Sequence, residues 1–263
     1  MKEKYGPWAL IAGGSEGIGE HFARDLAALG INLILLARRA EPLQRLAEKM
    51  IAEYGVKVRV ITADLTAPTM LDDIRAQTDD LEVGMLIYNA GVDNRASDFI
   101  DRSARGLRWS IDLTVIGQTV LAHHFGGLMR GRGHGGIILV GSLLAYAGGG
   151  GMSVYAAAKS YSHTLAKGLW YELRPYGVDV LGLVVSATKT PAYLKFGLPE
   201  DTGNDMVKAS DPALVAREGL EHLGKEPLWV VSEAQVMADY ITSLSPADAV
   251  ALVSSNAAEL REG

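Results

Sequence analysis

The sequence predicts an α/β fold, a doubly wound parallel sheet of seven strands with helices on both faces. Short apolar runs rich in Ile, Leu and Val alternate with longer segments of helical periodicity. The strand-like runs lack the polar–apolar alternation of a half-exposed sheet, so both faces of the sheet are expected to be covered. No long linker, repeat or low-complexity tract interrupts residues 1–263, which are therefore expected to form a single domain.

The first unit along the chain is a strand, a glycine-rich turn and a helix. Trp8–Ala12 is short and apolar, and Gly13-Gly14-Ser15-Glu16-Gly17-Ile18-Gly19 follows it at once. Apolar residues then recur at helical spacing through Leu29, and Gly30 is suited to end the helix. In this order a turn without bulky side chains can approach a pyrophosphate at the helix N-terminus. The unit predicts a dinucleotide site, with a merely tight strand-to-helix turn as the alternative.

The remaining elements continue the alternation. The later predicted strands are Asn32–Ala37, Val56–Ala63, Met85–Asn89, Gly136–Gly141, Val178–Val184 and Leu228–Val231. The predicted helices are Gly17–Leu29, Pro42–Tyr54, Pro68–Thr78, Ala104–Phe125, Val154–Arg174 and Pro212–Leu223. Pro42 and Pro212 suit the first turn of a helix, and Gly55 suits a helix end. The last segment, Ser232–Gly263, is expected to be mostly helical and carries no motif that we can interpret.

Tyr155 and Lys159 stand four residues apart in a predicted helix, so their side chains share one face. A phenol with a reference pKa near 10 is a poor base at neutral pH, and a nearby ammonium group favours the phenolate by Coulomb attraction. The pair therefore predicts acid–base chemistry at Tyr155, with Lys159 lowering the pKa of the phenol. Ser142, thirteen residues before Tyr155, supplies a hydroxyl that can hold a substrate oxygen.

Together these motifs resemble the short-chain dehydrogenase/reductase family. Gly13-x-x-x-Gly17-x-Gly19, Asn89-Ala90-Gly91, Ser142 and Tyr155-x-x-x-Lys159 have the family's order, and the similarity runs from about Tyr5 to Trp229. Tyr5-Gly6-Pro7-Trp8-Ala9-Leu10 and Leu36-Ala37-Arg38-Arg39 resemble, more weakly, the subgroup with 17β-hydroxysteroid dehydrogenases and 3-ketoacyl reductases. The resemblance implies a Rossmann-like sheet with strand order 3-2-1-4-5-6-7.

The resemblance also implies an activity, the interconversion of a ketone and a secondary alcohol with a nicotinamide cofactor. Tyr155 would transfer the proton, Ser142 would orient the substrate oxygen, and Lys159 would also hold the nicotinamide ribose. Two alternatives remain open: a non-catalytic NADP(H)-binding sensor or scaffold, and an enzyme resembling NDP-sugar epimerases or dehydratases. The latter relatives usually carry a longer C-terminal substrate domain.

The residues after the second strand indicate the type of cofactor. Enzymes that prefer NAD usually place an acidic residue there, which binds the ribose 2′-hydroxyl. This chain has Arg38 and Arg39, whose guanidinium groups can bind a 2′-phosphate, or can simply be solvated. We expect NADP(H) rather than NAD(H), with Arg38 as the main contact. Glu16, inside the glycine turn, is mildly unfavourable to that phosphate if it points inward.

Further cofactor contacts follow from the resemblance. The residues expected on the turn are Gly13, Ser15, Glu16, Gly17, Ile18 and Gly19. Asp64 and Leu65 would lie at the adenine, and Asn89, Ala90 and Gly91 at the adenine ribose, although Tyr88 replaces the usual outer asparagine. Thr188 and Thr190 keep hydroxyls in a nicotinamide loop in which Val185-Ser186 replaces the usual Pro-Gly.

Asp112 departs from the family pattern, because an asparagine normally completes the proton relay to the lysine at that position. An ionised aspartate can accept hydrogen bonds but cannot donate them. Asp112 therefore either strengthens the charge of Lys159 or interrupts the relay, and both alternatives stay open.

Composition narrows the function classes. The net charge is −6, with lysines and arginines scattered along the sequence, which argues against nucleic acid as a partner. The absence of cysteine excludes disulfides, thiolate catalysis and cysteine-ligated zinc. No metal site is expected, because the adjacent His123 and His124 cannot share a helix face and His134 and His163 have no ligand-like companions. No apolar run approaches the 18 residues of a membrane span, and the first strand leaves no room for a signal peptide. We expect a cytoplasmic enzyme of small molecules.

The sequence also predicts a glycine loop and a lid near the substrate, and a surface for self-association. Gly148-Gly149-Gly150-Gly151 lies between Ser142 and Tyr155 and predicts a flexible rim with room for a bulky, hydrophobic substrate, with an inert loop as the alternative. Residues 190–212 are expected to form a substrate lid. A homodimer or homotetramer is expected through the fourth and fifth helices, with an inward packing of the same side chains as the alternative. The apolar side chains expected there are Leu121, Phe125, Leu128, Leu165, Leu169 and Trp170.

Overall fold

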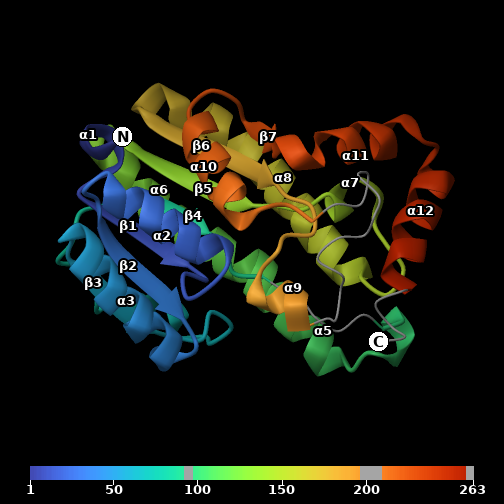
Figure 1. Ribbon diagram of the computed structural model, residues 1–263, viewed down its shortest axis with the longest axis horizontal. Coiled ribbons are helices and arrows are strands. Elements are labelled where there is room, and N and C mark those ends of the chain that lie inside the picture. The colour runs from blue at the N-terminus through green and yellow to red at the C-terminus, as the bar shows by residue number, and fades with distance from the viewer. Residues whose placement is uncertain (92–96, 196–208, 259–263) are drawn as a thin grey trace.

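A parallel seven-stranded sheet lies between two layers of helices in the computed structural model (Figure 1). The structure describes residues 1–91, 97–195 and 209–258. The strands are β1 (Trp8–Ala12), β2 (Asn32–Ala37), β3 (Val58–Thr62), β4 (Val83–Tyr88), β5 (Gly135–Val140), β6 (Val178–Val184) and β7 (Leu228–Val230). Their order is β3-β2-β1-β4-β5-β6-β7, so the Rossmann-like architecture and the expected strand order are confirmed.

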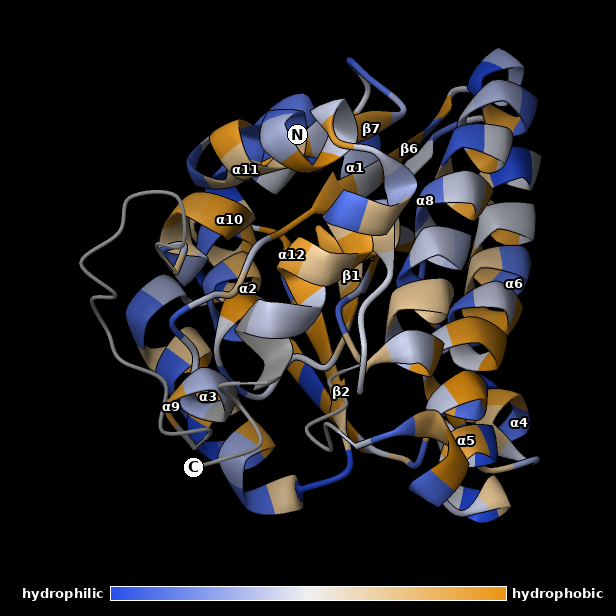
Figure 2. Ribbon diagram, turned by 90° about the vertical axis from the view of Figure 1, so that its right-hand side faces the viewer, coloured by the Kyte–Doolittle hydropathy of each residue, from blue (hydrophilic) through white to orange (hydrophobic). Residues whose placement is uncertain are grey.

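Helices flank the sheet along its whole width. They are α1 (Lys2–Tyr5), α2 (Ile18–Ala28), α3 (Ala40–Tyr54), α4 (Met70–Arg75), α5 (Ala104–Ile111), α6 (Gly117–Arg132), α7 (Leu144–Ala147), α8 (Ser153–Leu173), α9 (Pro191–Lys195), α10 (Pro212–His222), α11 (Ser232–Ser243) and α12 (Pro246–Ala258). Figure 2 shows α2 and α10 on one side of the strands and α6 and α8 on the other. The two crossover layers are those of a doubly wound fold.

Two apolar cores hold these layers to the sheet. On one face Phe22 of α2, Leu43 of α3 and Val215 of α10 pack on the strands and are fully buried. On the other face α6 contributes Leu121 and Phe125, which are 0% and 1% exposed. These last two side chains were expected in a self-association surface. That expectation is wrong for them, because their helix turns them toward the sheet.

The predicted long helix Ala104–Phe125 is interrupted, and its second half continues further than expected. Between α5 and α6 lies a π-helical turn, η2 (Asp112–Ile116), and α6 runs on to Arg132, where Gly133 ends it. Tyr88 accounts for part of this break, because its buried hydroxyl donates a hydrogen bond to the carbonyl of Leu113 within η2. A side chain at Gly117 would overlap that hydroxyl. The π-turn thus accommodates the tyrosine that replaces the family's asparagine.

The C-terminal segment is mostly helical, as expected, and packs beside the residues that follow β5. Ile241 of α11 and Val253 of α12 form a small apolar cluster with Leu144 and Ala147 of α7. Figure 1 shows α11 and α12 at the end of the molecule opposite β3. Helices α11 and α12 therefore form part of the rim around α7, and no sequence motif predicted this arrangement.

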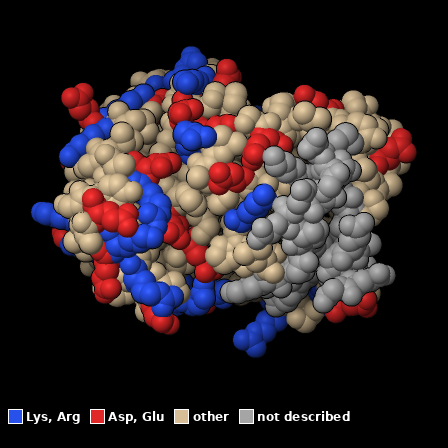
Figure 3. All heavy atoms as spheres, viewed as in Figure 1, with Lys and Arg blue, Asp and Glu red and all other residues tan. Residues whose placement is uncertain are grey.

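The surface carries mixed charge. On the face shown in Figure 3, Lys and Arg are interspersed with Asp and Glu rather than gathered into one basic patch. Within the ranges given above, no helix is long and apolar enough to cross a membrane.

Candidate active site

The glycine-rich turn is folded tightly against the ends of two strands. The amides of Gly13 and Gly14 donate to the carbonyl of Leu36, at 2.8 and 3.2 Å, where β2 ends. The side-chain amide of Asn89, just after β4, donates to the carbonyl of Gly13 at 3.0 Å. The turn, Asn89 and the residues after β2 therefore meet at the carboxyl edge of the sheet, where doubly wound folds bind their ligands.

Backbone geometry requires glycine in this turn. Gly13 and Gly17 have φ of 81° and 60°, which L side chains rarely adopt. A Cβ at Gly19 would overlap the carbonyl oxygen of Gly13, so the first turn of α2 sits directly on the glycine turn. The result is a tight backbone turn with few side chains before a helix N-terminus, which is the kind of turn that fits the pyrophosphate of a dinucleotide. Ile18 adds only its backbone here, because its side chain lies in the core.

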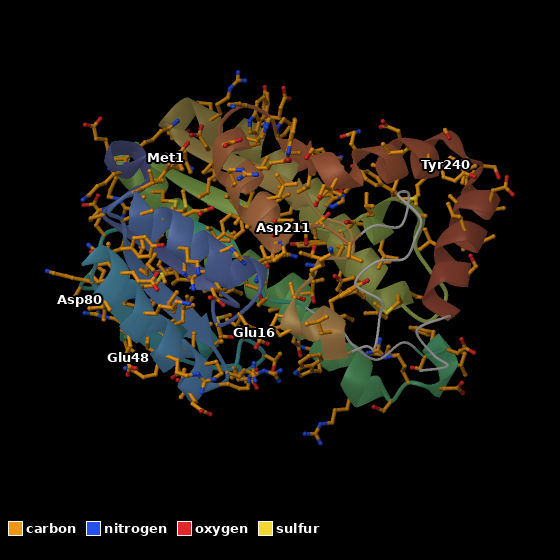
Figure 4. All side chains as sticks on the ribbon, viewed as in Figure 1. Met1, Glu16, Glu48, Asp80, Asp211 and Tyr240 are labelled. Carbon is orange, nitrogen blue, oxygen red and sulfur yellow. The ribbon has the colours of Figure 1, made fainter. Side chains whose placement is uncertain are left out.

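The two arginines after β2 have different surroundings. Arg39 forms an ion pair with Glu16 of the glycine turn, with 2.8 Å between Nη2 and Oε2. Figure 4 shows Glu16 between the N-terminal half of the molecule and α9. Arg38 is exposed, and its guanidinium carbon lies 5.4 Å from the centroid of the Trp109 ring. Glu16 thus offsets the charge of Arg39, and Arg38 is the better placed of the two to bind an additional phosphate.

Of the two residues expected at the adenine, Asp64 can offer its side chain and Leu65 only its backbone. Asp64 is exposed, and one of its oxygens accepts from the amide and the hydroxyl of Thr66, at 3.0 and 2.8 Å. Leu65 is only 5% exposed and packs in the core, so its side chain is turned away from the site. Only its peptide group can face a ligand.

Lys159 lies in the protein interior below the carboxyl end of β5. Its side chain is 3% exposed, and Nζ donates to the carbonyl of Val140 at 2.7 Å. Burial lowers the pKa of Lys159 to about 8, which still leaves the amine mostly charged at neutral pH. A Cβ at Gly91 would lie 3.5 Å from Nζ, so the strand-β4 loop and the lysine are neighbours.

Tyr155 and Ser142 complete the group. Nζ of Lys159 lies 5.6 Å from the centroid of the half-buried Tyr155 ring, one helical turn earlier on α8. Ser142 is 8% exposed and follows β5, two residues after Val140, whose carbonyl binds the lysine. Its Oγ accepts from the amide of Leu144 at 3.3 Å, so the hydroxyl proton remains able to donate elsewhere. The structure therefore brings the glycine turn, the lysine, the tyrosine and the serine to one edge of the sheet.

Comparison with known proteins identifies the group to which this arrangement belongs. The chain matches the short chain dehydrogenase family over residues 7–197. It is a short-chain dehydrogenase. A 7beta-hydroxysteroid dehydrogenase of Clostridium sardiniense is 32% identical over 89% of this chain and 88% of its own length. The matches establish an NAD(P)-dependent enzyme of this family and its fold.

Solved structures agree with the fold. A structure described as giving insight into 7beta-hydroxysteroid dehydrogenase stereoselectivity is similar with a TM-score of 0.89, at 26% identity over 96% of this chain and 98% of that one. A short-chain dehydrogenase from Sphingobium yanoikuyae in complex with NADPH has a TM-score of 0.77 at 31% identity, with 86% of each chain covered.

Asp112, which replaces the family's asparagine in this short-chain dehydrogenase, forms an ion pair with a cation of the preceding helix, α5. Nε of Arg108 lies 2.7 and 2.8 Å from the two carboxylate oxygens, and Arg108 itself is 75% exposed. The carboxylate therefore has a counter-ion one turn away, and it begins the π-turn η2. Arg108 therefore offsets part of its negative charge, and its effect on the proton relay stays open.

The loop after β6 reaches the glycine turn through only one of its two threonines. Thr190 packs against Gly17, where a Cβ would lie 2.7 Å from the threonine methyl, and its Oγ accepts from the amide of Tyr193 at 3.2 Å. Thr188 is 8% exposed, and its hydroxyl donates to the carbonyl of Ser186 at 3.0 Å. Of the expected lid, residues 196–208, with Phe196, Leu198 and Met206, lie outside the described residues.

The last two glycines of the four-glycine loop between Ser142 and Tyr155 form hydrogen bonds to other segments. The amide of Gly150 donates to the hydroxyl of Ser254 on α12 at 2.8 Å, and the carbonyl of Gly151 accepts from the amide of Ser97 at 3.1 Å. The absence of side chains lets α12 approach, since a Cβ at Gly149 would lie 3.2 Å from Val253. The glycines allow close packing of the C-terminal helix α12, and the flexibility of this rim stays a prediction.

His163 is the residue near the site that sequence reasoning set aside. It lies one turn after Lys159 on α8, is 5% exposed, and its Nε2 accepts from the amide of Ser142 at 3.3 Å. Its spacing of four from Lys159 could have placed it on the same helix face. Its partner, 21 residues earlier on a strand end, could not be found without the fold.

Proposed function

We propose that this short-chain dehydrogenase interconverts a ketone and a secondary alcohol on a bulky, hydrophobic substrate and prefers NADP(H). The observation that carries the proposal is the Ser142, Tyr155 and Lys159 group, with Lys159 buried and tied to the strand that presents Ser142. A phenol, an ammonium group and a hydroxyl are suited to acid–base chemistry at a carbonyl oxygen. The 7beta-hydroxysteroid dehydrogenase relative suggests a steroid-sized substrate.

The roles of the three residues follow from their chemistry. When bound, the nicotinamide supplies or accepts the hydride. In the direction of reduction, the phenol of Tyr155 gives its proton to the carbonyl oxygen, while the hydroxyl of Ser142 donates a hydrogen bond to the same oxygen. The ammonium group of Lys159, 5.6 Å from the tyrosine ring, favours the phenolate that remains. In the direction of oxidation, the phenolate takes the proton back from the alcohol.

The preference for NADP(H) rests on the different surroundings of the two arginines. Arg39 is paired with Glu16, and Arg38, which is exposed, lies two residues after the carbonyl that holds the glycine turn. A guanidinium group there can form two charge-assisted hydrogen bonds to a 2′-phosphate. The pyrophosphate would lie on the backbone of residues 13–19, the adenine beside Asp64, and the ribose beside Asn89 to Gly91. The NADPH complex of the Sphingobium relative supports this choice.

A screen of NADPH oxidation tests the activity. The substrates are ketones that increase in size from small aliphatic ketones to 3-ketoacyl thioesters and ketosteroids, with NADH as the parallel cofactor. The proposal predicts turnover of at least one bulky ketone and a higher kcat/KM with NADPH. An enzyme that binds NADPH and turns over no ketone in the series would favour the second candidate, a non-catalytic NADP(H) sensor, for which the Arg108-paired Asp112 is the motivating observation.

Assembly and location complete the proposal. We propose that residues 1–263 form one domain and assemble into a homodimer or homotetramer through α6 and α8. Leu128 and Tyr171 on these helices are 44% and 75% exposed. Light scattering at micromolar concentration would measure a mass of at least twice 28.1 kDa, and a monomer mass would contradict this part. A cytoplasmic location stays a prediction from the cysteine-free composition.

A further inference from the structure

A buried histidine continues the face of α8 that carries the catalytic pair. Tyr155, Lys159 and His163 follow one another at intervals of four residues, so they form a single stripe along the helix. His163 is 5% exposed and lies behind Ser142 rather than in front of it. The hydrogen bond and the packing of this imidazole can therefore set the position of Ser142 from within the protein interior.

The amide of Ser142 takes the imidazole as its hydrogen-bond acceptor, because it points away from β6 while the amides on either side of it point toward β6. The amides of Gly141 and Leu143 donate to the carbonyls of Leu183 and Val185, at 2.7 and 2.9 Å, and continue the ladder with β6. The amide between them donates to Nε2 of His163 at 3.3 Å. An unpaired buried amide is costly, so this bond fixes the backbone from which the serine hydroxyl projects.

Close packing holds the imidazole in place. A Cβ at Gly141 would overlap the Nε2–Cδ2 edge of the ring, so glycine is required next to Ser142. The ring of Tyr146 from α7 packs on the imidazole with 5.5 Å between centroids. The imidazole thus packs between its own helix, α8, and two neighbours, α7 and the end of β5, and all three border the site.

The hydrogen bond requires a particular protonation state. Nε2 can accept only when it carries no proton, so the neutral ring holds its proton on Nδ1. Burial, and then the charges of Lys159 and Lys167, lowers the pKa of His163 to about 4. Tyr146 is the titratable group that faces the ring from another element of the described structure. The imidazole therefore stays neutral at physiological pH.

We propose that His163 is a positioning residue, which accepts the amide proton of Ser142 and so holds the serine hydroxyl in the orientation that the reaction needs. The kinetic part of this inference rests on the proposed function. His163 does not contact substrate, cofactor or reacting atoms in this role. Its loss should therefore lower kcat while leaving the affinity for NADPH unchanged.

Kinetics of matched variants test the role. The probes are NADPH and a steroid with a 7-keto group. His163→Leu removes the acceptor and should lower kcat about tenfold or more, because small misplacements of reacting groups are costly. His163→Gln keeps an acceptor oxygen near the position of Nε2 and should stay within about threefold of wild type. Both variants should bind NADPH with a Kd within about twofold of wild type.

A second histidine serves as the control for the loss of an imidazole from a helix. His124→Leu, on α6, removes a ring whose buried Nε2 has no hydrogen-bond partner within the described ranges, and its kcat should be unchanged. Equal losses for His163→Leu and His163→Gln, or no loss in either, would overturn the positioning role. Wild-type protein that fails on every ketone would instead refute the proposed function.

The hydrogen bond can also be tested without activity. In protein labelled with 15N-histidine, the signals absent from the spectrum of His163→Gln belong to His163. At pH 7 they should show a protonated Nδ1 and an unprotonated Nε2. A proton on Nε2, or a cationic ring, would overturn the inference whatever the kinetics show, and whether or not His163→Leu folds.

Discussion

A charged amine in the interior of a protein depends on its immediate neighbours, and Lys159 has a carbonyl as its hydrogen-bond partner. Burial lowers its pKa to about 8, so its positive charge is present at neutral pH and is lost in mildly alkaline solution. Nζ stays bound to the Val140 carbonyl, which fixes the charge beside the ring of Tyr155. At this scale the proposed chemistry rests on one cation, one phenol and one hydroxyl placed near the end of β5.

The neutral state of His163 has a consequence for stability in acid. Its pKa is about 4 in the folded protein and near 6.5 in the unfolded chain, so unfolding binds a proton between these values. The contribution is fully present above pH 6.5 and is lost as the pH falls toward 4. Between pH 7.5 and pH 5, wild type should lose about 2 kcal/mol more unfolding free energy than His163→Gln. Denaturant titrations at the two pH values measure this difference, and parallel losses would contradict it.

The proposed preference for NADP(H) also rests on single residues. Arg38→Gln should lower the preference for NADPH over NADH at least tenfold, because a hydrogen bond to a charged group contributes about 1.5–3 kcal/mol. The control is the double variant Glu16→Gln, Arg39→Gln, which removes the neighbouring ion pair without changing net charge and should shift the preference less. The measurement is kcat/KM with both cofactors, and a wild type that prefers NADH would refute the assignment directly.

At the scale of elements, strand ends and loops bring the site together. β1 leads into the glycine turn, β4 into Asn89 and β5 into Ser142, and the parallel order of the sheet places all three at one edge. The C-terminal helix α12 then closes on the loop of residues 148–151, which carries no side chains to keep it away. The rim of the site therefore depends on a segment about a hundred residues away in the sequence.

The contact between α12 and this loop can be tested by amide exchange. Ser254→Ala removes the acceptor of the Gly150 amide and should speed exchange in the peptide around Gly150 about fivefold, as expected for the loss of about 1 kcal/mol. Ser255→Ala is the matched control, because that hydroxyl donates within its own helix, to the carbonyl of Leu252. Unchanged exchange in Ser254→Ala would show that the loop is held by packing alone.

Local patterns predict those parts of the fold whose cause is local. The apolar run of β1, the glycine turn and the periodicity of α2 are all encoded in neighbouring residues, and they were found from the sequence. The break at Asp112–Ile116 was missed, because it depends on the hydroxyl of Tyr88 on a distant strand. His163 was missed for the same reason. Its polar partner, the Ser142 amide, is fixed by strand pairing.

At the scale of the whole molecule, the apolar cores and the candidate site occupy different parts of the doubly wound sheet. The two cores on either face of the sheet bury the large side chains, including Leu121 and Phe125. The polar groups of the site lie at the carboxyl edge, where the strands end and the crossover loops begin. Substitutions at this edge should therefore alter turnover or binding more than they alter the free energy of unfolding.

The most direct test of the account compares wild type with Tyr155→Phe, using NADPH and the best ketone of the screen. The substitution removes the hydroxyl that exchanges the proton and keeps the ring beside Lys159. General acid–base catalysis contributes about 10²–10⁴-fold, so turnover should fall by at least that range while the Kd for NADPH is nearly unchanged. Turnover within a few-fold of wild type would contradict the central claim that Tyr155 is the acid–base group of a ketone reductase.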